Sequence, residues 1–77
     1  MTLTVEIIRD PDEGGFTARL PDIPAYGESE TENEAIDDLK EAIRGYIETF
    51  GLEDAISRVA HPALRTIELE LAELARG

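Results

Sequence analysis

Cysteine is absent from the 77 residues, and histidine occurs only once, as His61. A chain without cysteine has neither disulfides nor thiolate metal sites, and one histidine cannot build a histidine-rich metal centre. Apolar runs are also short, and none approaches the roughly 18 residues that a membrane-spanning helix needs. The N-terminus shows neither the basic start nor the long apolar stretch of a signal peptide. We therefore expect a cytoplasmic protein that holds no metal ion and no cofactor.

Positive charge is scarce as well. Seven Lys and Arg residues stand against 18 Asp and Glu residues, giving a net charge of −11. Between residues 10 and 41, eleven acids face only two bases. An acidic field repels nucleic acid phosphates and attracts basic surfaces, although acidity also serves simply to keep a small protein soluble. The composition therefore argues against direct nucleic acid binding and leaves a basic protein partner as one interpretation.

The length predicts one domain, spanning residues 1–77, with a thin core. A chain of this size buries only about 60% of the surface that it exposes when unfolded. Such domains often rely on disulfides, a metal ion or a partner chain. Because the first two are excluded, we expect a homodimer or a higher homo-oligomer, formed through a sheet edge or an uncovered sheet face.

A hairpin is expected at the start of the chain. Residues 2–9 alternate apolar and mixed side chains, which is typical of a strand with one buried face. Residues 10–15 combine a proline with two adjacent glycines, a composition that favours a turn. Residues 16–20 then resume the alternation, so the two strands are predicted to pair.

A third strand is expected at the edge of the same sheet. Pro21 and Pro24 cannot donate hydrogen bonds to a ladder, so the second strand should end before them. Residues 25–30 follow, and within them Glu28 and Glu30 alternate with smaller residues. Charged alternation of this kind suits an edge strand, where it discourages unwanted pairing.

The longest predicted element is an amphipathic helix over residues 31–50. Thr31 and Glu34 form a capping-box pattern, in which each side chain bonds the other residue's backbone amide. Gly51 stands where a helix C-cap glycine belongs. Gly45, inside the helix, predicts a close neighbour such as a strand. Apolar residues recur at helical spacing and define one face: Ala35, Ile36, Leu39, Ala42, Ile43, Tyr46, Ile47 and Phe50.

The last third of the chain is less regular. Residues 52–61 have helical spacing and favour a short second helix or a turn that ends at Pro62. In residues 65–71, Ile67, Leu69 and Leu71 alternate with glutamates, which is a strand pattern, yet the composition of the tail also suits a helix. We favour the strand, because a meander followed by one helix needs a further strand to close the sheet.

The chain resembles the HicB antitoxin family over residues 5–47. The resemblance rests on the ordered run Asp10-Pro11-Asp12-Glu13-Gly14-Gly15-Phe16-Thr17-Ala18-Arg19-Leu20-Pro21-Asp22-Ile23-Pro24. It continues in Gly27-Glu28-Ser29-Glu30-Thr31, Glu34-Ala35 and Leu39-Lys40-Glu41-Ala42-Ile43. The chain departs from the family at the Pro-x-x-Pro bend, where many members have Gly-Cys and this sequence has Ala25-Tyr26.

The resemblance implies an α+β fold of order β-β-β-α-β, a reduced version of the RNase H fold. It also implies a partner: a small basic HicA-like toxin that cleaves mRNA, which the antitoxin covers and neutralises without catalysing anything. Family members often continue into a DNA-binding segment. We expect none here, because the residues after the last expected strand are not basic enough to grip DNA.

The expected partner-binding residues are mostly acidic and surround the start of the helix. Acids at these positions would mimic RNA phosphates toward a basic protein, or they simply form a solvated face that also favours the helix dipole. Tyr26 is the aromatic candidate, because tyrosine is enriched at interface centres, although it also suits the thin core. The set is Asp22, Tyr26, Glu28, Glu30, Glu34, Asp37, Asp38 and Glu41.

Two other functions stay open as alternatives. The first is an interaction module of the same fold without a toxin. The second is a vestigial nuclease, which would need Glu6, Glu68 and Glu70 to converge on one sheet face and hold metal ions. The apolar strand faces should pack on the helix, so these glutamates should point away from it. His61 is expected on a surface loop.

Overall fold

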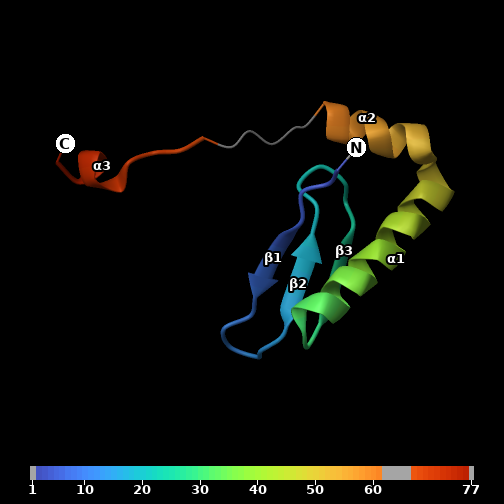
Figure 1. Ribbon diagram of the computed structural model, residues 1–77, viewed down its shortest axis with the longest axis horizontal. Coiled ribbons are helices and arrows are strands. Elements are labelled where there is room, and N and C mark those ends of the chain that lie inside the picture. Colours follow the sequence, from blue (N-terminus) through green and yellow to red (C-terminus); the bar gives the residue numbers. More distant parts are fainter. Residues whose placement is uncertain (1, 62–66, 77) are drawn as a thin grey trace.

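The computed structural model describes residues 2–61 and 67–76 and shows an α+β fold (Figure 1). Three antiparallel strands form one sheet in the order β1-β2-β3, and helix α1 lies across one face of it. Helix α2 follows α1 directly, and α3 lies near the C-terminus. The elements are β1 (Glu6–Arg9), β2 (Phe16–Arg19), β3 (Tyr26–Ser29), α1 (Glu32–Phe50), α2 (Leu52–Ala60) and α3 (Leu71–Arg76).

The expected hairpin and third strand are confirmed, with shorter strands. β1 begins at Glu6, which pairs with Arg19. Continuing this register toward the N-terminus would bring Thr4 opposite Pro21, which has no N–H to donate, so pairing ends there. At the other end, the Asp10 carboxylate accepts hydrogen bonds from the backbone amides of Asp12 at 2.9 Å and Glu13 at 3.1 Å. These bonds hold the turn and lower the pKa of Asp10.

Helix α1 begins and ends as the sequence predicts, with one difference at its start. Thr31 is the N-cap, and its hydroxyl oxygen accepts a hydrogen bond of 3.2 Å from the backbone amide of Glu34. The Glu34 carboxylate does not close the capping box but accepts from the Ser29 hydroxyl at 2.8 Å. This bond ties the first turn of the helix to the end of β3. Gly51 ends the helix with φ of 92°, a conformation that favours glycine.

The close approach of helix and sheet occurs at Gly27, and the expectation for Gly45 is wrong. A Cβ atom built on Gly27 would collide with the α1 backbone at Ala35 and Leu39 and lie 2.8 Å from the Asp38 carbonyl carbon. A Cβ atom on Gly45 meets nothing within 4 Å. Because Gly27 has no side chain, β3 supports the helix backbone directly, and α1 packs more extensively on β3 than on β2.

The core lies between α1 and strands β2 and β3. Leu39 is 1% exposed and is the largest fully buried side chain, and Ala18 and Ala35 flank it. The predicted helix face is confirmed except at Phe50, which is exposed. The helix does not cover β1, contrary to the expectation that all apolar strand faces pack on it. Leu3, Val5 and Ile7 therefore remain 37–41% exposed.

The C-terminal part differs from the strand that we favoured over residues 65–71. Residues 67–70 form no regular element, and Leu71 begins helix α3, while residues 65 and 66 lie outside the described part of the chain. The alternation of Ile67, Leu69 and Leu71 fits a strand, but the nearby sequence does not show which strand it would pair with. The alternation alone therefore could not decide between strand and helix. The helical alternative, supported by the Leu, Ala and Glu content, describes residues 71–76 correctly.

The expected second helix is confirmed as α2, and a polar cluster joins it to α1. The buried Tyr46 of α1 donates a hydrogen bond from its hydroxyl to the Asp54 carboxylate of α2. The Arg58 guanidinium pairs with the same carboxylate at 3.3 Å and lies 5.8 Å from the centroid of the Tyr46 ring. The hydrogen bond from Tyr46, supported by Arg58, holds the pKa of Asp54 below its ordinary value of 3.8.

This cluster predicts a loss of stability in acid. A carboxyl group whose pKa is lowered on folding stabilises the protein above the unfolded pKa, and the contribution disappears as the pH falls through the folded pKa. For Asp54 that window lies below about pH 4. The thermal midpoint should therefore fall more between pH 5 and pH 3 in the wild type than in Asp54→Asn. Asp37→Asn, which removes an exposed carboxylate from α1, is the matched control and should follow the wild type.

Candidate protein-binding surface

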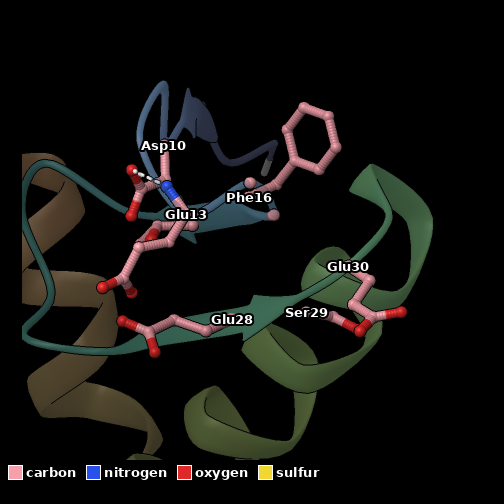
Figure 2. A pocket seen from close by; sticks show the side chains of 9 residues that line it. Asp10, Glu13, Phe16, Glu28, Ser29 and Glu30 are labelled. Atoms are coloured by element: carbon pink, nitrogen blue, oxygen red, sulfur yellow. Dashed lines mark hydrogen bonds between the residues drawn. The ribbon is translucent and has the colours of Figure 1, made fainter.

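The first of two acidic hollows lies beside the hairpin turn. It has a volume of about 800 Å³ and is bordered by the 10–16 segment, by Thr17 and by the 28–30 segment. Figure 2 shows the Glu13 and Glu28 carboxylates pointing to the same side, away from the Phe16 ring. Four carboxylates line the hollow: Asp10, Glu13, Glu28 and Glu30. Cationic side chains are absent from its lining, so its electrostatic potential is strongly negative.

The second hollow lies on the other side of β3, between that strand and the first turns of α1. Its volume is about 370 Å³, and it shares Glu28 and Ser29 with the first hollow. Its carboxylates belong to Glu28, Glu34, Asp37, Asp38 and Glu41. We call the eight carboxylates of the two hollows the acidic surface, which is centred on the end of β3.

The acids of this surface differ in what they bond. The Asp38 carboxylate accepts a hydrogen bond of 3.0 Å from the backbone amide of Glu28. This bond fastens α1 to the outer edge of β3. Asp37 and Glu41 pair with the exposed cations Lys40 and Arg44, respectively, and exposed pairs of this kind contribute little to stability. Glu34 is held by Ser29, as described above. The Glu28 and Glu30 carboxylates make no hydrogen bond or ion pair within the described residues, so they are available to a partner.

Six of the eight expected partner-binding residues lie on the acidic surface. The other two lie elsewhere. Tyr26 is 60% exposed on the sheet face opposite the helix, next to Arg19 in the register. Asp22 is half-buried in the β2–β3 connection, and its Oδ1 atom is buried without a hydrogen-bond partner in the structure.

Sequence reasoning missed Asp10 and Glu13, which complete the first hollow. Their place in a Pro- and Gly-containing run indicates only a turn. The hairpin register carries the signal that could have found them, because Arg9 pairs with Phe16 and Phe16 pairs with Ser29. The residues of the turn must therefore lie beside the end of β3, where Glu28 and Glu30 already were candidates.

The three glutamates considered for a nuclease do not come together. Glu6 lies on β1 and pairs with Arg19 at 3.0 Å, the ordinary cross-strand partner. Glu68 and Glu70 lie in the C-terminal segment, apart from the sheet (Figure 1). Across residues 2–61 and 67–76, no group of three or more Asp, Glu or His side chains is placed to hold a metal ion. His61 follows α2 and is exposed.

Two further findings concern the chain as a whole. Within the part of the chain that the structure describes, no helix is both long and apolar enough to cross a membrane. The chain was compared with family models, with curated proteins and with solved structures, and none of the three comparisons gives a match.

Proposed function

We propose that this chain is an inhibitory protein of the HicB antitoxin type, which binds a small basic HicA-like RNA-cleaving protein and catalyses no reaction itself. The observation that supports this function is the acidic surface. It gathers eight carboxylates around the end of β3, and its largest hollow is lined by no cation. A basic RNA-binding protein carries the complementary charge, because it must attract phosphates.

The arrangement of the acidic surface suits a protein that competes with RNA. Carboxylates spaced around a hollow present negative charge to the same cationic side chains that bind a phosphate backbone. Phe16 and Ser29 add an aromatic and a hydroxyl contact beside them. Complementary charge of this kind chiefly accelerates encounter and sets specificity.

The proposal predicts a neighbouring gene for a small basic protein, and it is tested by coexpressing the chain with that protein and measuring RNA cleavage. We expect a stable complex and full inhibition at equal concentrations. Continued cleavage with the chain in excess would rule out the inhibitory function.

Charge variants test whether the acidic surface is the binding surface. In Glu28→Gln/Glu30→Gln, the association rate with the basic partner should fall by about tenfold at low salt, because steering charges act mainly on association. The matched control is Glu48→Gln/Glu53→Gln, which changes the net charge equally but lies outside both hollows. Surface plasmon resonance at two salt concentrations measures both pairs. Equal losses in the two pairs would show that only overall charge matters and that the partner binds elsewhere.

A further inference from the structure

An apolar groove opens between α1, α2, the residues before β1 and the β2–β3 connection. Its volume is about 300 Å³, and it lies away from the acidic surface. Only apolar residues line it, among them Leu3, Ile43, Ile47, Leu52, Ile56 and Val59. Leu3, Leu52 and Ile56 are 41–57% exposed. Val5 and Ile7, which follow Leu3 at alternate positions, are each 37% exposed as well.

A second set of apolar side chains lies in the C-terminal segment, residues 67–76. Ile67, Leu69, Leu71 and Leu74 are 60–78% exposed. Helix α3 contains only six residues, whereas isolated helices shorter than about 12 residues are marginal in water. Leu71, Leu74 and Ala75 share one face of this helix, at spacings of three and four residues. The segment therefore needs an apolar surface to pack against.

We propose that the segment 67–76 of one copy packs in the apolar groove of a second copy, and that the exchange is reciprocal. In its own chain the helix α3 of this segment lies apart from α1, α2 and the sheet (Figure 1). A short amphipathic helix with anchors at i, i+3 and i+4 is the ligand that a groove between helices accepts. Reciprocal exchange gives a closed two-fold dimer, the commonest form of homo-oligomer.

Reciprocal exchange places two such contacts in one interface. Each copy contributes the apolar residues of its segment and the eight apolar residues that line its groove, so the buried apolar surface is twice that of a single segment in a single groove. The inference is independent of the proposed function, because neither acidic hollow takes part.

Light scattering after gel filtration tests the proposal on the full chain. We expect a dimer at micromolar concentration, and a monomer for Leu71→Glu/Leu74→Glu and for the groove variant Ile56→Glu. All three positions are exposed in the single chain, so circular dichroism should show a retained fold. Glu73→Ala, on the polar side of the segment, is the control and should stay dimeric. A monomeric wild type, or a dimer that survives both apolar variants, would overturn the proposal.

Cross-linking shows whether the segment belongs to the same chain or to the second copy. Because the chain has no cysteine, Ile56→Cys and Leu74→Cys can be prepared separately, mixed and treated with a short bismaleimide. A covalent heterodimer joining the two variants is the expected product. In a chain that carries both substitutions, an intramolecular link at high dilution without covalent dimer would show that the segment occupies its own groove, contrary to the proposal.

Discussion

Gly27→Ala should destabilise the protein by about 3 kcal/mol, the upper end of the usual range for overpacking. The added methyl group would meet the backbone of α1 at Ala35 and Leu39. Backbone atoms cannot rotate away as a side chain can, so the helix would have to move off the sheet. Urea unfolding followed by circular dichroism measures the change. The free energy of unfolding of a folded domain is only about 5–15 kcal/mol in total. Much of the Gly27→Ala protein should therefore be unfolded at moderate urea concentrations.

Gly45→Ala is the matched control for this variant. The same substitution is made on the exposed side of α1, where the added methyl group meets nothing within 4 Å beyond the helix's own backbone. Alanine is the better helix former, so the control should be more stable than the wild type by about 1 kcal/mol. Similar effects of the two substitutions would contradict the close contact between β3 and α1.

Leu39→Ala should cost about 2–5 kcal/mol, the range for removing a large buried aliphatic side chain. Leu39 is 1% exposed and lies where the helix meets both β2 and β3. No other large side chain in the described residues is as fully buried, so little remains nearby to fill the cavity. Thermal unfolding at fixed protein concentration measures the loss.

The neighbouring Lys40 provides the control for the Leu39 variant. Lys40 is exposed and its pairing with Asp37 at 3.7 Å is weak, so Lys40→Ala should change the stability by no more than about 0.5 kcal/mol. An unchanged melting temperature in Leu39→Ala would mean that the buried face of α1 has been wrongly identified.

Most of the fold could be predicted because its signals are local. The Thr31 cap, the apolar face of α1, the glycines of the turn and the two prolines after β2 each act within a few residues. The C-terminal segment could not be predicted, because a short run of alternating leucines and glutamates fits a strand and a helix equally well. The choice depends on what packs against it.

The importance of Gly27 over Gly45 could not be predicted, for a similar reason. A glycine inside a helix is conspicuous in a sequence, whereas a glycine in a short strand is ordinary. Only the position of the helix across the sheet shows which of them has a neighbour. The acidic surface was predictable where one run of sequence supplies it, and not where the hairpin brings in Asp10 and Glu13. The family resemblance and the toxin partner stay predictions.

The bond between Asp38 and the Glu28 amide has a consequence for self-association. A free backbone amide on an outer strand invites another strand to add, and repeated addition leads to fibres. Here a carboxylate occupies that donor and also repels an approaching carbonyl oxygen. The β3 edge is therefore protected at Glu28 against the addition of a further strand, which disfavours open-ended growth of the sheet on that side.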